Sequence, residues 1–189
     1  MGYQAIDELL GVPSRELWLV TSRSESALGG LIASFVAQVS LVPELPRVLI
    51  GIAKHHHTWS LIEESEAFAL HLLAIADVDL AWRFGLATGH QVDKFHGLHY
   101  RTGKTGSPIV ECTMGWLDCV VETRVDIGDR TIYVAAVVDG AKVGGSDPLT
   151  AQQLFGLASD EQRQELDSAL VRDRAIDSEA IERWRLGDG

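Results

Sequence analysis

Residues 31–42, LIASFVAQVSLV, constrain the fold most, because they form a long, mostly apolar run between a glycine pair and a proline. Side chains alternate between the two faces of a β-strand, so odd and even positions separate into two sets. The odd positions are all apolar and predict a core face: Leu31, Ala33, Phe35, Ala37, Val39 and Leu41. The even positions mix apolar residues with Ser34, Gln38 and Ser40. That second face is either partly solvated or a flat, hydrogen-bonding surface for a planar ligand.

The first three quarters of the chain contain short β-strand patterns with a few helical patterns between them. Apolar runs bounded by turn-forming or charged residues predict strands within 15–22, 47–53, 68–75, 93–103, 108–128 and 131–144. Residues 23–30 and the Gly128-Asp129 pair predict turns. Helices are expected at 1–11, 59–67 and 77–85, the last with Asp77 as its N-cap. Strands that follow one another in a meander favour a small antiparallel barrel.

From Pro148 onward the composition becomes that of helices. A last, separate helix is expected after Asp177 or Ser178, either of which can act as its cap. The sequence therefore divides into a barrel domain, residues 1–149, and a C-terminal helical extension, residues 150–189, which packs on the barrel or on a second subunit. Two helix starts in this extension carry the capping-box pattern: Thr150 with Gln153, and Ser159 with Gln162.

Charge and composition exclude several classes of function. The formal net charge of −11 argues against a nucleic-acid partner, because phosphate neutralisation needs clustered Lys and Arg. No apolar stretch reaches the roughly 20 residues of a membrane span, and no signal-peptide pattern opens the sequence. Cys112 and Cys119 both lie in apolar, strand-like sequence. We expect two buried thiols in a cytoplasmic protein rather than a disulfide or a metal site.

The stretch AKHHHTW at 53–59 places three histidines between a predicted strand and a predicted helix. Adjacent histidines are poorly arranged for a metal, since neighbours in a strand or helix point in different directions. The stretch is either a solvated, His-rich loop or an anion site. The second interpretation uses the cation of Lys54 and a helix N-terminus capped by Thr58, where a phosphate is well placed.

An ordered series of motifs from about Leu17 to Leu149 resembles the flavin reductase-like family, which has the FMN-binding split-barrel fold. A glycine-containing turn leads into a strand with Val39-Ser40-Leu41, then a proline turn and the strand RVLIGIA. Then follow KHHHT, an inserted helix, FALHLL, LAWRFG, DKF and GWLDCVVETRVDIGD. The resemblance implies a mainly β protein with added helices, an antiparallel split β-barrel of the FMN-binding type with a C-terminal helical extension.

The resemblance also implies which residues hold the flavin. The first long strand would lie along the isoalloxazine and ribityl groups, and the histidine loop would hold the phosphate. The segment Asp93-Lys94-Phe95 would approach the flavin from the same or the neighbouring subunit of a homodimer. The implied cofactor-binding residues are Leu31, Ile32, Ala33, Ser34, Gln38, Ser40, Ala53, Lys54, His55, His56, Thr58, Lys94 and Phe95.

The chain departs from the family pattern in three places. Many members have Gly-Asp-His before the last strand, near the nicotinamide, whereas this chain has Arg130 there. Arginine binds phosphate or carboxylate but does not donate a proton near neutral pH. His71 stands where Asn is common, and it is either part of the site or a core histidine with one satisfied hydrogen bond. The third departure is the acidic helical tail, which covers the site, shapes a substrate pocket or extends a dimer.

These observations favour an NAD(P)H-dependent flavin reductase that uses FMN or FAD, with NADH or NADPH as donor. Such an enzyme supplies reduced flavin to a partner monooxygenase, and Arg130 would help to orient the nicotinamide nucleotide. We assign no catalytic acid or base, because the cofactor supplies the chemistry of hydride transfer. The alternative is an FMN-binding electron carrier that takes electrons from a protein. A third, weaker alternative is a barrel that holds another phosphorylated aromatic compound such as pyridoxal phosphate.

Overall fold

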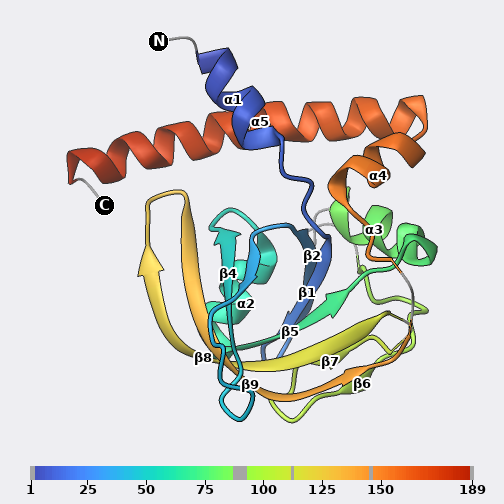
Figure 1. Ribbon diagram of the computed structural model, residues 1–189. Helices are drawn as coiled ribbons and strands as arrows, with labels where there is room; N and C mark the ends of the chain where they lie inside the picture. Colours follow the sequence, from blue (N-terminus) through green and yellow to red (C-terminus); the bar gives the residue numbers. More distant parts are fainter. Residues whose placement is uncertain (1–2, 87–92, 112, 145–146, 188–189) are drawn as a thin grey trace.

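The computed structural model describes residues 3–86, 93–111, 113–144 and 147–187 (Figure 1). The strands are β1 Trp18–Arg23, β2 Leu28–Ala33, β3 Val36–Gln38, β4 Arg47–Ala53, β5 Ala67–Leu72, β6 Arg101–Thr102, β7 Pro108–Ile109, β8 Gly115–Asp126 and β9 Arg130–Lys142. The helices are α1 Tyr3–Gly11, α2 His57–Ser65, the short 3₁₀ helix η1 Ile75–Asp77, α3 Val78–Gly85, α4 Ala151–Leu157 and α5 Asp160–Leu186.

Seven strands form one antiparallel, curled sheet in the order β2-β1-β5-β8-β9-β4-β3, and β6 pairs with β7 separately. The predicted antiparallel barrel architecture is therefore present. The predicted simple meander is wrong, because β4 pairs with β3 and β9, and β5 pairs with β1 and β8. Only β1–β2, β3–β4 and β8–β9 are pairs of consecutive strands in the large sheet.

The predicted single strand over 31–42 is instead broken at a corner formed by Ser34 and Phe35. Strands β2 and β3 lie at opposite ends of the sheet order, yet only these two residues separate them. Because consecutive Cα atoms are only 3.80 Å apart, the two ends of the sheet must curl toward each other. The corner is tied to β4 by a hydrogen bond from the Gly51 N–H to the Phe35 carbonyl (3.0 Å).

The corner also ends the predicted core face. Leu31 and Ala33 are buried, but the odd positions beyond the corner are exposed: Phe35, Ala37, Val39 and Leu41. Val36, an even position, packs against the buried cluster instead. The alternation therefore changes face where the chain turns from one edge of the sheet to the other.

The barrel core is built from side chains of all the principal strands. Its fully buried members include Val20, Ile50, Phe68, Leu70 and Tyr133. A second cluster lies outside the barrel, under α3, and contains Leu19, Leu73, Phe84, Phe95 and Leu149. These two clusters fix β1 and β2 between the barrel interior and α3.

Two consecutive glycines in β2 let two different elements approach its backbone. A Cβ at Gly29 would lie 2.6 Å from Cδ1 of Leu61 in α2. A Cβ at Gly30 would lie 2.7 Å from two ring atoms of Phe84 in α3. Neighbouring strand residues point to opposite faces, so Gly29 lets α2 approach one face of β2 and Gly30 lets α3 approach the other.

His71 is a core residue. It is fully buried in β5, and its Nε2 accepts a hydrogen bond from the Val110 N–H (3.0 Å). Because Nε2 accepts, the neutral ring carries its proton on Nδ1, which donates to the Leu19 carbonyl (3.0 Å). Burial lowers the pKa of His71 to about 4, although the hydrogen bond to the Leu19 carbonyl acts in the opposite direction and raises it. The core alternative was thus the better one, with two hydrogen bonds where one was expected.

The helix caps were predicted with mixed success. Both capping boxes of α4 and α5 are confirmed. A separate last helix after Asp177 or Ser178 is wrong, because α5 continues through both residues. Thr58 is not a cap either, since it lies buried inside α2. Asp77 is the N-cap residue of α3, as predicted, but its carboxylate accepts from the Ala74 N–H (2.8 Å) and makes no capping hydrogen bond to α3.

Several smaller predictions can be compared with the structure. The strand predicted at 47–53 coincides with β4, and Gly128, with φ of +98°, lies in the β8–β9 turn as expected. The turn predicted at 23–30 is shorter, since β2 already begins at Leu28. Cys119 is a buried free thiol, whereas Cys112 lies outside the described residues. Among the described helices, none is long and apolar enough to cross a membrane.

We predict that Gly30→Ala lowers the free energy of unfolding by about 1–3 kcal/mol, because the new methyl group overlaps the Phe84 ring. Urea denaturation of the purified protein measures the change. Gly156→Ala in α4 is the matched control, since a Cβ there meets no atom within 4 Å and alanine favours a helix. Equal stability of Gly30→Ala and the unmodified protein would contradict the close packing of α3 on β2.

We also predict that His71 makes folding stability depend on acidity. The unfolded state binds a proton at His71 with a pKa near 6.5, whereas the folded state does so only near pH 4. The contribution of neutral His71 to the free energy of unfolding is therefore fully present above pH 6.5. It decreases by roughly 3 kcal/mol as the pH falls from 6.5 to 4. Denaturation curves of His71→Asn across this range should show a shallower loss, although the variant is less stable at pH 7. Parallel pH profiles would refute the assignment.

Candidate functional site

A cavity of about 270 Å³ lies at the corner between β2 and β3, where the end of β4 and the middle of α5 also meet. It brings together eight of the residues predicted from the sequence, from three separate segments. These are Leu31, Ile32, Ala33, Ser34, Ala53, His55, His56 and Arg130. The remaining lining residues are Phe35, Gly51, Ile52, Leu170, Asp173 and Asp177.

The histidine loop forms the N-terminal side of α2 at this cavity. His56 is the N-cap residue with extended backbone, and its side chain makes no capping hydrogen bond. The first N–H groups of a helix lack partners within the helix, so this end presents donors and a positive dipole end. Burial, and then the neighbouring His55, lower the pKa of His56 to about 4, so its ring is neutral at pH 7. The ring centres of His55 and His56 lie 4.3 Å apart.

Arg130 provides the cation that lines the cavity. Its Nε donates to Oδ2 of Asp129 (2.5 Å), and its Nη2 donates to Oδ2 of Asp177 (2.9 Å). Its guanidinium also lies 5.1 Å from the ring centre of Phe35, within the range of a cation–π contact. Both carboxylates are already bonded to Arg130, and one of them comes from α5.

Helix α5 places two carboxylates against His55. Oδ1 of Asp173 lies 3.6 Å from Nε2 of His55, and Oδ1 of Asp177 lies 3.5 Å from Nδ1. Neither contact meets hydrogen-bond geometry, so both ring nitrogens and Oδ1 of Asp177 are buried without a hydrogen bond. Burial is the largest cause that raises the pKa of Asp177, and the Asp129 and Asp173 charges add to it against Arg130 and His55. Buried polar atoms without a hydrogen bond are unusual in a folded protein, and here they gather at the cavity wall.

Four other predicted residues are engaged elsewhere. Lys54 Nζ donates to Oδ2 of Asp126 (2.5 Å), and this bond lowers the pKa of Asp126. Thr58 is buried beside β2, where its hydroxyl lies next to Gly29. Lys94 and Phe95 are buried under β2 and α3.

Lys94 has a structural environment. Its Nζ donates to the carbonyls of Gly30 (3.0 Å) and Phe84 (2.8 Å), so it joins the outer edge of β2 to the C-terminal end of α3. Burial lowers the pKa of Lys94 to about 8. Phe95 packs edge-to-face on Phe84 and Tyr100. These contacts fix β2, the strand predicted to lie along the flavin, from the side of α3.

Gln38 and Ser40 lie beyond the corner, away from the cavity. The Gln38 side chain donates to the Ser40 carbonyl (2.7 Å). Gln38 also lines a larger, mostly apolar groove of about 740 Å³, together with Trp18, Val36 and Trp116. The sequence therefore predicted one site, whereas the structure brings eight of its residues to the cavity, places Gln38 in the groove and leaves the others outside both.

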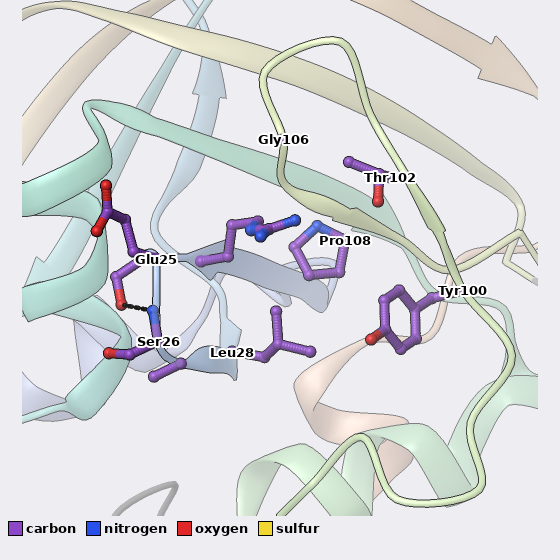
Figure 2. A pocket seen from close by; sticks show the side chains of 10 residues that line it. Glu25, Ser26, Leu28, Tyr100, Thr102, Gly106 and Pro108 are labelled. Carbon is purple, nitrogen blue, oxygen red and sulfur yellow. Dashed lines mark hydrogen bonds between the residues drawn. The ribbon is translucent and has the colours of Figure 1, made fainter.

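A third hollow, of about 290 Å³, lies at the β1–β2 turn (Figure 2). Glu25, Ser26 and Leu28 form one side, and Tyr100 and Pro108 lie across from them (Figure 2). None of the predicted flavin-binding residues is among those that line it. We therefore place the candidate site at the corner cavity.

Sequence reasoning did not find Phe35, Gly51 and the three residues from α5 as part of this site. Phe35 had been assigned to a core face. Asp173 and Asp177 are four residues apart, which puts them on one helix face with Leu170. That spacing was a usable signal, although it does not reveal what the face contacts. Among the described residues, no cluster of His, Cys, Asp or Glu is arranged to hold a metal.

Comparison with known proteins identifies the class of protein. Residues 12–153 match the flavin reductase like domain family, and the chain belongs to this family. A ferric-chelate reductase (NAD(P)H) of Archaeoglobus fulgidus is 30% identical over 136 residues, which cover 71% of this chain and 79% of that protein. A high molecular weight rubredoxin of Moorella thermoacetica is 27% identical over 136 residues. The match covers 71% of this chain but only 58% of the rubredoxin, less than two thirds of its length.

The fold is shared with solved structures of the same class. The crystal structure of a nitrilotriacetate monooxygenase component B from Mycobacterium thermoresistibile is 28% identical and superposes with a TM-score of 0.66. The match covers 78% of this chain and 83% of that chain. The predicted split barrel is thereby confirmed. Helix α5 lies beyond the part of the chain that matches the family.

Proposed function

We propose that this chain is an NAD(P)H-dependent flavin reductase that binds its flavin in the corner cavity. The observation that carries the proposal is the meeting of Leu31–Ser34, the histidine loop and Arg130 around one cavity, in a chain of the flavin reductase family. The bound flavin supplies the hydride-transfer chemistry, and the protein's task is to hold and orient it.

Most residues at the cavity have the chemical character that flavin binding requires, with two exceptions. The extended backbone of Leu31–Ala33 offers a flat surface with peptide groups for a planar ring. The N-terminal end of α2 and the His55 nitrogens, which have no hydrogen-bond partner, suit an anionic phosphate. Arg130 suits either that phosphate or the nicotinamide nucleotide. The two carboxylates from α5 do not suit a phosphate, and the volume of 270 Å³ is below the roughly 300–1,000 Å³ of usual ligand pockets.

We propose FMN or FAD as the flavin and NADH or NADPH as the donor. The solved relative is a component of a monooxygenase, which supports a partner monooxygenase that consumes the reduced flavin. We also propose a homodimer. The apolar groove beside Trp18 and Trp116 supports it, as does α1, whose apolar side chains are exposed. Location in the cytoplasm stays a prediction.

The deciding measurement is an anaerobic absorbance titration with excess FMN and a catalytic amount of protein. We expect NADH or NADPH to bleach the visible flavin band at a rate that is proportional to the protein concentration. A parallel titration with FAD identifies the preferred flavin, and protein heated to unfolding is the control. Bleaching by neither nucleotide, with a flavin that dithionite reduces, would overturn the reductase proposal.

One observation favours a second candidate, an electron carrier that receives its electrons from a protein. The guanidinium of Arg130 is already bonded to Asp129 and Asp177, which leaves it less available to a nucleotide. The rubredoxin relative is consistent with a redox partner of this kind. Tight flavin that only dithionite or a reduced redox protein bleaches is the result that this candidate predicts.

A further inference from the structure

Helix α5 lies across the part of the cavity that is proposed to hold the flavin phosphate. Figure 1 shows this helix running across one end of the barrel, above β2 and β4. Its middle contributes Leu170, Asp173 and Asp177 to the cavity wall. The two carboxylates lie against His55, and one of them also accepts from Arg130. Helix α5 therefore already places anionic groups where an anion is expected.

The cations of the proposed phosphate position, Arg130 and the loop lysine Lys54, are both paired already. Arg15, which makes no ion pair within the described part of the chain, lies at Phe35 instead, 5.0 Å from its ring centre. Arg130 is bonded to Asp129 and Asp177, and Lys54 is bonded to Asp126. Asp173 adds a further carboxylate. A phosphate carries nearly two negative charges at pH 7, so it would meet like charges at close range. Phosphate and the α5 carboxylates thus compete for the same partners.

The attachment of α5 to the barrel is weak for its length. Within its 27 residues, all of which the structure describes, no residue is buried. Several large apolar side chains are exposed by more than 40%: Leu170, Val171, Ile176, Trp184 and Leu186. A close contact besides the acidic pair is at Gly128, where Trp184 leaves no room for a Cβ. Displacing such a helix exposes little surface that is now buried.

The chain also provides a joint at which α5 can move. Helix α4 is anchored by the buried Leu154, and Ala158 and Ser159 then have extended backbone before α5 begins. The capping box between Ser159 and Gln162 stabilises the first turn of α5 without any contact to the barrel. Motion about this two-residue link does not require α5 to unfold.

We propose that α5 is a lid that discriminates between flavins by their phosphate, with Asp173 and Asp177 occupying the phosphate position until a phosphate-bearing flavin displaces them. This inference rests on the proposed function, since it takes the corner cavity as the flavin site. Riboflavin has the same ring and ribityl chain but no phosphate, so it does not compete with the two carboxylates. The carboxylates therefore weaken FMN binding selectively.

The test compares FMN and riboflavin on the full chain, without any nicotinamide nucleotide. Dissociation constants are measured by flavin fluorescence for the unmodified protein and for the double variant Asp173→Asn, Asp177→Asn. We expect the double variant to bind FMN at least tenfold more tightly and riboflavin within twofold of the unmodified protein. Amide hydrogen exchange in the β8–β9 turn at Gly128, which Trp184 of α5 covers, should rise when FMN binds to the unmodified protein and should not rise with riboflavin. Exchange within α5 itself should stay unchanged, because the helix moves without unfolding.

The matched control is Glu165→Gln, Asp167→Asn, which removes the same charge from exposed positions of the same helix. We expect this control to leave both affinities within twofold, so that a general effect of net charge is separated from the cavity contacts. Thermal unfolding confirms that all variants are folded. Unchanged or weaker FMN binding in the Asp173, Asp177 variant, with riboflavin still bound, would overturn the lid but leave the flavin site intact. Failure of every protein to bind either flavin would overturn the proposed function as well.

Discussion

Closure of the barrel depends on the corner at Ser34 and Phe35. Because β2 and β3 are the two ends of the sheet order, a two-residue connection forces the sheet to curl round on itself. Two edges that meet at a corner are not paired along their whole length, so peptide groups there remain available to side chains or a ligand. Lys94 takes one such group, the Gly30 carbonyl, from the side opposite the core. The candidate site is thus a consequence of how the sheet closes.

The sequence was informative where structure is local. The bounds of β4 and the two capping boxes follow from neighbouring residues alone, and all were predicted. The corner in 31–42 was missed because neither Ser34 nor Phe35 is a turn-forming glycine or proline, and the apolar alternation continues through it. Closure of the sheet decides the break, and closure is a long-range effect that no local pattern records.

The candidate site likewise contains one part that the sequence predicted and one part that it did not. The segments that a family resemblance covers meet at one cavity, as Leu31, His55 and Arg130 illustrate. Helix α5 lies outside that resemblance, so its part in the site could only come from coordinates. Asp177 was read as a cap because aspartate is common at helix starts. Its actual surroundings, Arg130 and His55, come from segments far away in the sequence.

Under the proposed lid, the groups around the histidine loop bind either of two anions, the carboxylates of α5 or the phosphate of the flavin. His56 stays neutral at pH 7 because it is buried beside another histidine, and the one lysine of the loop, Lys54, is already paired with Asp126. Arg130 and the N-terminal end of α2 are then the main attractions for an anion at the cavity. A strongly basic loop would hold the carboxylates of α5 and a phosphate alike, with no exchange between them. A loop whose lysine is paired elsewhere, beside an arginine that is already engaged, instead makes the two anions alternatives in this proposal, because the same donors cannot satisfy both at once.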